Sequence, residues 1–179
     1  MDSSDKPAIW LLRHAKAASD GPSGDISRPL TGKGRRQADS VREHFRSLAP
    51  KALQILPNLV LCSPATRARE TAEIVMPALP DAHIQFDQVL YDEDADGVLE
   101  WLRQLDPPEP RMMLVGHNPT LQELCLILTR PVFHDELESM GLPTAALMRF
   151  DEPVATGSTG WRGLAPGAAS LGHRFDPRS

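Results

Sequence analysis

The sequence contains little cysteine, and it shows neither a long apolar run nor the pattern of an N-terminal targeting segment. Only two cysteines occur in 179 residues, Cys62 and Cys125, and each lies in an apolar run. We therefore expect two buried, reduced thiols rather than a disulfide or a metal site. No apolar run approaches the roughly 18 residues that span a bilayer, and no basic region precedes the short apolar stretch near the N-terminus. These absences predict a cytoplasmic protein with no membrane partner.

An excess of basic residues is also missing. Lys and Arg number 19 against 24 Asp and Glu, which gives a formal net charge of −5. Proteins that bind nucleic acid carry a strongly basic face, so we expect no nucleic-acid partner. Gly32 and Gly34 lack the Gly-Lys-Ser/Thr ending of a nucleotide-binding loop, and no dinucleotide fingerprint occurs. A local basic pocket for a small anion remains compatible with this charge.

The length and the hydrophobic content favour one domain over residues 1–179. Hydrophobic residues make up 41% of the chain, which is enough for a core. We expect this core to cover about residues 7–165. From about Asp151 the sequence is rich in Gly, Ala, Pro and Ser, which predicts an edge strand around Trp161 and then a loose tail.

Apolar runs and helical periodicity alternate along the chain. Short apolar runs predict strands, and apolar residues spaced by three and four predict helices. Ser63 and Asn118 are each followed by proline, a pattern typical of a helix cap and first turn. Alternating strands and helices predict an α/β fold with three layers, α/β/α, around a mostly parallel sheet. The expected strands are 8–12, 59–62, 84–86, 112–116 and 145–150, with helices over 31–48, after 63, around 98–105 and after 118.

Three segments share one design, an apolar strand that ends in polar residues. They read WLLRHAK, LVLCSPATR and MLVGHNPT, and they carry Arg13, His14, Arg67 and His117. In open α/β sheets, ligands bind at the carboxyl ends of the strands, where these residues would meet. Arginine makes paired bonds to phosphate oxygens, helix N-termini favour anions, and neutral histidine can attack phosphorus. The pattern therefore indicates a site for a phosphoryl group.

Five motifs in order resemble the histidine phosphatase superfamily. Leu-Leu-Arg-His-Ala at 11–15 resembles its RHG signature, and the segments at 63–72 and 115–119 resemble its second and third motifs. The segments 28–34 and 142–146 are similar to the compact SixA-type branch of phosphohistidine phosphatases. The resemblance covers roughly residues 8–150 and implies a phosphoglycerate mutase-like fold.

The resemblance also implies a role for each site residue. His14 is expected to attack phosphorus and to form a phosphohistidine intermediate, which water hydrolyses. Arg13 and Arg67 would bind the phosphoryl oxygens, and His117 would stabilise the transition state. No metal and no cofactor are implied. The expected partner is a phosphorylated protein that carries phosphohistidine, and the chain is expected to be a monomer or a weak dimer.

Two positions depart from the family pattern. The usual glycine after the nucleophile is Ala15, so its backbone should be ordinary, because alanine disfavours positive φ. Larger members carry a Glu or Asp that protonates the leaving group, and the candidates here are Asp92 and Glu93. A solvated acidic cluster is the more ordinary interpretation of this run. An imidazole leaving group needs less acid than an alkoxide, so a missing acid would fit a phosphohistidine substrate.

Several alternatives stay open at this point. Lys16 could touch substrate, whereas Arg28 is expected to pair with a carboxylate and to pin its loop. A phosphatase for small esters, such as a sugar phosphate or a nucleotide-derived phosphate, is the main alternative function. A phosphomutase would need a stable phosphohistidine and a lid, for which few residues remain. A non-catalytic phosphate-binding module is the alternative from another class.

Overall fold

A computed structural model of the chain describes residues 7–52, 55–105, 110–151 and 161–178, and the side chains of 50–52 lie outside that description. The strands are β1 (Ala8–Arg13), β2 (Leu59–Cys62), β3 (His83–Phe86), β4 (Arg111–Gly116), β5 (Leu147–Asp151) and β6 (Ser170–Phe175). The α-helices are α1 (Gly32–Ala52), α2 (Thr66–Val75), α3 (Val89–Asp92), α4 (Ala95–Gln104), α5 (Thr120–Leu128) and α6 (His134–Met140).

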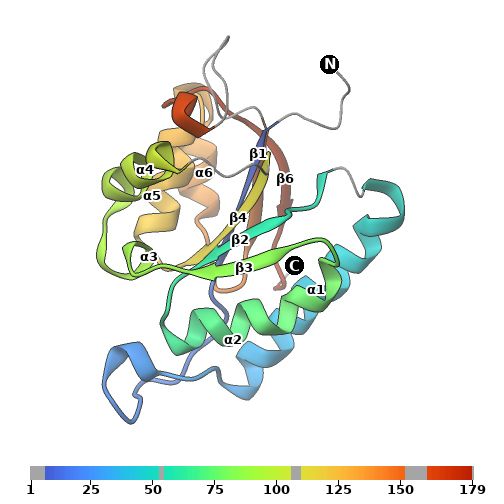
Figure 1. Ribbon diagram of the computed structural model, residues 1–179, viewed down its shortest axis with the longest axis vertical. Coiled ribbons are helices and arrows are strands. Elements are labelled where there is room, and N and C mark those ends of the chain that lie inside the picture. Colours follow the sequence, from blue (N-terminus) through green and yellow to red (C-terminus); the bar gives the residue numbers. More distant parts are fainter. Residues whose placement is uncertain (1–6, 53–54, 106–109, 152–160, 179) are drawn as a thin grey trace.

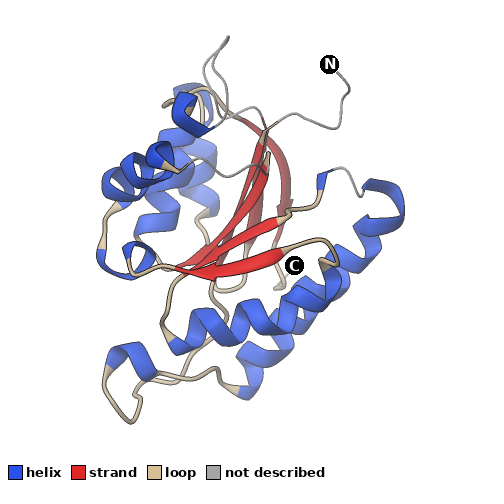
Figure 2. Cartoon of the chain, viewed as in Figure 1, coloured by secondary structure: helices blue, strands red, loops and turns tan. Residues whose placement is uncertain are grey.

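The six strands form one sheet in the order β3-β2-β4-β1-β5-β6. The four strands from β3 to β1 run parallel to one another. At the other edge of the sheet, β5 pairs antiparallel with β1, and β6 pairs antiparallel with β5. Figure 2 shows this twisted sheet between two groups of helices. The prediction of a three-layer fold with a mostly parallel sheet is therefore confirmed.

Alternation along β1 explains the two layers of core. Ile9 and Leu11 point to the face that α4, α5 and α6 cover, and Trp10 and Leu12 point to the face that α1 and α2 cover. The two groups of helices flank the sheet in Figure 1. Because α1 follows β1 and α5 follows β4, the chain leaves these two neighbouring strands toward opposite faces. Their carboxyl ends therefore form the switch point at which open α/β sheets bind ligands.

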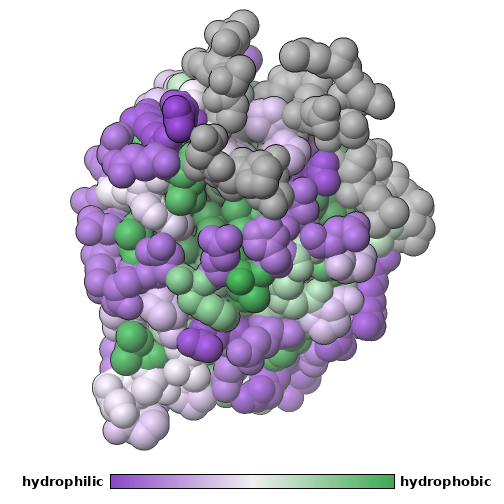
Figure 3. All heavy atoms as spheres, viewed as in Figure 1, coloured by the Kyte–Doolittle hydropathy of each residue, from purple (hydrophilic) through white to green (hydrophobic). Residues whose placement is uncertain are grey.

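The outer surface in this view is mixed. Figure 3 shows hydrophilic residues over the helices on both flanks and hydrophobic atoms near the centre, around the edge strand β3. Cys62 and Cys125 are buried and free, as expected, and burial raises the pKa of the Cys125 thiol to about 12. Within the described residues, no helix is both long and apolar enough to cross a membrane.

Three details differ from the sequence-based expectations. The expected edge strand near Trp161 is wrong, because Trp161 is buried in a 3-10 turn and the edge strand forms at 170–175, within the expected tail. Helix α2 begins at Thr66, two residues after Pro64, and the Ser63 hydroxyl accepts a long bond from the Ala65 N–H at 3.4 Å. Helix α5 begins at Thr120, without a cap bond from Asn118. The side chains of Ser63 and Asn118 instead contact His117 and the Leu142 carbonyl.

Candidate active site

The four predicted site residues line one cavity of about 350 Å³ at the carboxyl ends of β1 and β4. Arg13 pairs with Gly116 in the β1–β4 ladder, and the His14 N–H donates to the Gly116 carbonyl at 3.0 Å. This register places the rings of His14 and His117 5.0 Å apart. Arg67 reaches the cavity from the first turn of α2. The lining is Arg13, His14, Lys16, Ala17, Asp25, Arg28, Arg67, His117, Asn118 and Thr144.

The ring of His14 has a defined tautomer. Its Nδ1 lies 2.8 Å from the carbonyl oxygen of Ala15. Because a carbonyl only accepts, Nδ1 carries the proton and Nε2 keeps its lone pair. Burial, followed by the charges of Arg67 and Arg13, lowers the pKa of His14 to about 4, against the raising effect of the Ala15 bond. His14 is therefore neutral near pH 7 and presents Nε2 as a nucleophile.

Thr71 fixes the backbone that orients His14. The Ala15 N–H donates to the Thr71 hydroxyl at 3.0 Å, and that hydroxyl donates to the Arg67 carbonyl at 2.6 Å. Ala15 is fully buried and does not adopt a positive φ, as its side chain requires. The expectation of an ordinary backbone at this position is confirmed. One hydroxyl thus links the loop after β1 to the first turn of α2.

Arg67 is 6% exposed and holds three contacts. Its Nε donates to His117 Nδ1 at 3.2 Å, Nη1 donates to the Asp25 carbonyl at 2.7 Å, and Nη2 donates to Asp25 Oδ2 at 2.9 Å. A guanidinium carries five N–H groups, so two remain for another acceptor. Such a fixed fork suits the oxygens of a phosphoryl group.

The contacts of His117 also assign its protons. Because Arg67 can only donate, His117 Nδ1 accepts, and the proton lies on Nε2, 2.8 Å from the Ser63 hydroxyl. Burial and the nearby His14 and Arg67 lower the pKa of His117 to about 3. A bound dianion would oppose these causes and raise the pKa of both rings. The charge of His117 is therefore sensitive to what occupies the cavity.

Arg13 lies at the side of the cavity nearest the loop before β5. Its Nη1 donates to the Leu142 carbonyl at 2.9 Å. Burial, followed by the charge of Arg178, lowers the pKa of the Arg13 guanidinium from its ordinary value. A guanidinium loses its proton only far above neutral pH, so Arg13 stays charged.

Asp25 is a site residue that the sequence analysis missed. Its carboxylate accepts bonds from Arg28 at 2.7 Å, from Arg67 at 2.9 Å and from the Tyr91 hydroxyl at 3.0 Å. Bonds from Arg28 and then Arg67 hold the pKa of Asp25 well below its ordinary value, so it is ionised. The expectation that Arg28 pairs with a carboxylate to pin its loop is confirmed. The available signal was the spacing of three residues between Asp25 and Arg28 in one loop.

The expected acid candidates lie elsewhere. Asp92 is the last residue of α3, and Glu93 follows it. Neither is among the residues that line the cavity, whereas Asp25 and Lys16 are. Within the described ranges, no group of three or more His, Cys, Asp or Glu side chains is placed to hold a metal ion.

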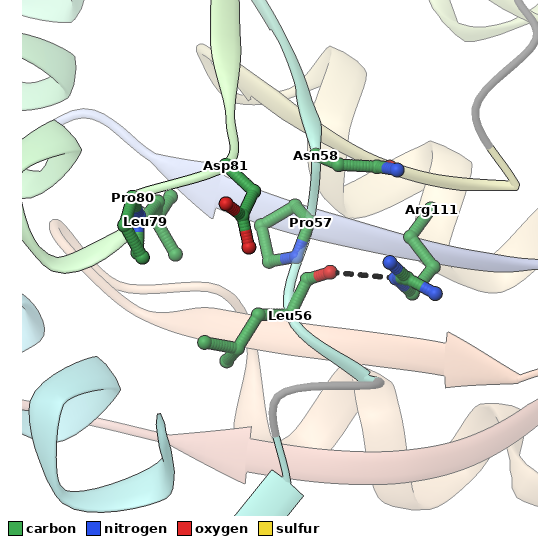
Figure 4. Close-up of a pocket in the computed structure, with 7 residues that line it drawn as sticks. All are labelled: Leu56, Pro57, Asn58, Leu79, Pro80, Asp81 and Arg111. Carbon is green, nitrogen blue, oxygen red and sulfur yellow. Dashed lines mark hydrogen bonds between the residues drawn. The ribbon is translucent and has the colours of Figure 1, made fainter. Parts of the chain in front are cut away.

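A second hollow lies at the amino ends of the strands, opposite the catalytic cavity, near the starts of β2 and β4 (Figure 4). It has a volume of about 20 Å³, and Arg111 donates to the Leu56 carbonyl across it at 2.8 Å. A space of this size holds about one water molecule, so it is too small for a substrate.

Comparison with known proteins decides the family. The model of the histidine phosphatase superfamily (branch 1) matches residues 9–104, which include His14 and Arg67. The chain belongs to the histidine phosphatase superfamily. An uncharacterized protein of Mycobacterium tuberculosis is 28% identical over 167 residues, which cover 89% of this chain and 96% of that protein.

Solved members of this superfamily share the fold over almost the whole chain. A protein of Agrobacterium tumefaciens, assigned as the phosphohistidine phosphatase SixA, is 26% identical with a TM-score of 0.73, covering 96% of this chain and 98% of its own. The protein histidine phosphatase SixA in complex with tungstate has a TM-score of 0.71 at 21% identity, covering 96% and 97%. The recognition from the sequence motifs is thus confirmed at the level of superfamily and fold.

Proposed function

We propose that this chain is a phosphatase that works through a covalent phosphohistidine at His14. Nε2 attacks phosphorus, the bond to the leaving group breaks, and a bond between Nε2 and phosphorus forms. Water then attacks phosphorus, the Nε2–P bond breaks, and its electron pair returns to Nε2 as phosphate is released. Because the proton stays on Nδ1, hydrogen-bonded to the Ala15 carbonyl, His14 leaves as a neutral imidazole.

The main support for this proposal is that a neutral nucleophile, His14, lies in a cavity lined by cations. The His14 tautomer leaves Nε2 with a lone pair in a cavity lined by Arg13, Arg28 and Arg67. These cations favour the charge of a phosphoryl group in the ground state and the transition state. The two N–H groups of Arg67 that have no partner among the described residues are suited to the phosphoryl oxygens. His117, whose pKa would rise beside a dianion, would supply a further donor.

Phosphohistidine on a protein is the substrate class that we propose. The carboxylate that lines the cavity, Asp25, is ionised and bonded to two arginines, so it is poorly suited to protonate a leaving group. When the other ring nitrogen of a phosphohistidine carries a proton, its imidazole leaves neutral and needs no proton at the breaking bond. An alkoxide leaving group does need one, so this site favours a phosphoramidate over an ester.

The first prediction tests the nucleophile by phosphate release. Wild type is expected to release phosphate from a phosphohistidine protein and peptide faster than from phosphate esters, and His14→Ala to lose more than about a thousandfold in kcat. His83→Ala, at the opposite end of the sheet on β3, is the matched histidine variant. Full activity of His14→Ala would overturn the mechanism, and a strong preference for free esters would favour the small-ester alternative. Tight binding of phosphohistidine without release would favour a binding module.

A further inference from the structure

A groove larger than the catalytic cavity lies beside it. Its volume is about 540 Å³, and it lies along α5 and α6. Asn118 lines both spaces, so the groove and the catalytic cavity are neighbours. The lining of the groove is Asn118, Pro119, Gln122, Glu123, Leu126 and Glu138.

The two spaces carry opposite charge. Four cations and one carboxylate line the catalytic cavity, whereas the charged residues that line the groove are Glu123 and Glu138, both exposed. Helix α6 adds the exposed Asp135 and Glu136 nearby. Arg130, between α5 and α6, is the cation in the connecting segment. The groove therefore favours a positively charged occupant, in contrast to the neighbouring phosphoryl site.

The segment between α5 and α6 carries exposed apolar side chains. Val132 and Phe133, in the 3-10 turn that begins α6, are 78% and 41% exposed. Exposed large apolar side chains are typical of a protein contact, and these two lie on the segment that joins the two helices along the groove. Neither these two residues nor Glu138 is among those that line the catalytic cavity.

Shared hydrogen bonds hold the groove and the catalytic cavity together. The Asn118 amide donates to the Leu142 carbonyl at 3.0 Å and to Gln122 at 3.1 Å, and Arg13 donates to the same carbonyl at 2.9 Å. Leu142 follows the end of α6, so this bond connects the helix that carries Glu138 to Arg13, which the proposed function assigns to the phosphoryl oxygens. A side chain bound in the groove would therefore lie at a fixed offset from the phosphoryl group.

We propose that this groove binds the segment of a partner protein that flanks its phosphorylated residue, and that it selects segments with Lys or Arg. This inference rests on the proposed function, because the phosphorylated residue must occupy the catalytic cavity at the same time. The lysine or arginine contacts Glu123 and Glu138, and apolar residues of the partner pack on Phe133. The groove thus distinguishes among phosphorylated proteins by the charge around the phosphoryl group.

The test compares matched phosphopeptides on wild type and on Glu123→Gln/Glu138→Gln. The peptides carry phosphohistidine or phosphoserine and have either three lysines or three glutamates in the flanking positions. Wild type is expected to favour the lysine peptides at least tenfold in kcat/KM at low salt, and the double variant to lose about five- to tenfold on them, since each exposed pair contributes about two- to fivefold. Turnover of free phosphoramidate should stay within twofold. Glu73→Gln removes the same charge from α2, on the other face of the sheet, and should change the turnover of neither the peptides nor free phosphoramidate.

Binding measured on His14→Ala separates this proposal from the chemistry. If turnover fails on every substrate, the proposed function is wrong, but the lysine phosphoserine peptide must still bind more tightly than the glutamate peptide for the groove to stand. Equal affinity for the two peptides would contradict the proposed role of the groove. So would a double variant that loses as much turnover of free phosphoramidate as of the peptides. Turnover of free compounds with no peptide turnover would overturn it as well.

Discussion

Among single residues, one carboxylate balances the cations of the catalytic cavity. Asp25 accepts bonds from Arg28 and Arg67, and Tyr91 donates a third. Two of the three contacts of Arg67 go to Asp25, through its carbonyl and its carboxylate. Asp25 therefore orients the guanidinium so that its remaining N–H groups face the cavity. We assign it as a positioning residue rather than a general acid.

Replacement of Asp25 tests this assignment. Asp25→Asn is expected to lower kcat/KM for a phosphoramidate about tenfold, because a small misplacement of a binding group is costly to catalysis. Asp92 and Glu93 lie outside the cavity lining, so Asp92→Asn and Glu93→Gln should keep kcat/KM within about twofold of the wild-type value. The measurement is steady-state phosphate release from all three variants. Loss of turnover in either control variant would contradict the argument that no acid is needed, and a fully active Asp25→Asn would contradict the positioning role.

The sequence predicts Arg13, His14, Arg67 and His117 more readily than Asp25, for a physical reason. The four residues lie at or shortly after the carboxyl ends of apolar parallel strands, and such strands bring these positions together. Asp25 lies in the loop between β1 and α1, and its position depends on the fold of that loop against α2. No periodic pattern reports such a contact. The same limit applies to Asn118, whose place between two cavities depends on the loop before β5.

At the scale of elements, the start of α1 supports the loop that carries His14. The Lys16 carbonyl accepts bonds from the Thr31 N–H at 2.9 Å and the Thr31 hydroxyl at 3.0 Å. The Lys16 N–H donates to Gln37 at 3.0 Å. Helix α1 therefore docks directly on the residues that follow the nucleophile. Gly34 permits this approach, since a Cβ there would overlap the Lys16 carbonyl oxygen and lie 2.9 Å from its carbon.

Two glycines of α1 give a matched pair of variants. Gly34→Ala is expected to destabilise the fold by about 1–3 kcal/mol, because backbone must move to admit the methyl group, and to lower kcat by displacing His14. Gly32→Ala, whose Cβ would meet only Arg36 at 3.7 Å, should be neutral or stabilising by up to about 1 kcal/mol. Urea unfolding and phosphate release measure the two effects. Equal behaviour of the two variants would show that the contact with Lys16 does not constrain the site.

The elements themselves differ in how well the sequence predicts them. β1, β2 and β4 are buried on both faces, so continuous apolar runs mark them. α3 and α6 span four and seven residues, too short for a periodic pattern to stand out. β6 alternates exposed with half-buried residues at the sheet edge, and its pairing with β5 decides its structure. Tertiary contacts therefore determine the elements that the sequence analysis missed.

For the whole molecule, folding creates a site that opposes protonation of its own histidines. His14 and His117 come from strands about a hundred residues apart, and each is surrounded by arginines only after the sheet forms. The Ala145 N–H closes the arrangement by donating to the carbonyls of Arg13 and His14 at 3.0 and 3.2 Å. In the unfolded chain both histidines return to an ordinary pKa near 6.5. The difference couples the stability of the fold to pH.

This coupling has a defined sign and window. The folded pKa is about 4 for His14 and about 3 for His117, both below the unfolded value, so the unfolded chain binds more protons between those values and pH 6.5. The free energy of unfolding should therefore fall as pH decreases from 6.5, by up to about 1.4 kcal/mol per unit for each histidine. Carboxylates such as Asp25 add a loss of the same sign only at lower pH.

Urea unfolding between pH 4.5 and 7 isolates the histidine contribution. His14→Ala should show a shallower slope than wild type by up to about 1.4 kcal/mol per unit, since it lacks one of the two groups. His83→Ala controls for the loss of a histidine outside the site. Saturating sulfate, which stays a dianion between pH 4.5 and 7, should also flatten the wild-type slope, because a bound dianion raises the pKa of both rings toward the unfolded value. A slope in His14→Ala equal to that of wild type would show that folding does not lower the pKa of His14, which would contradict a buried, neutral His14.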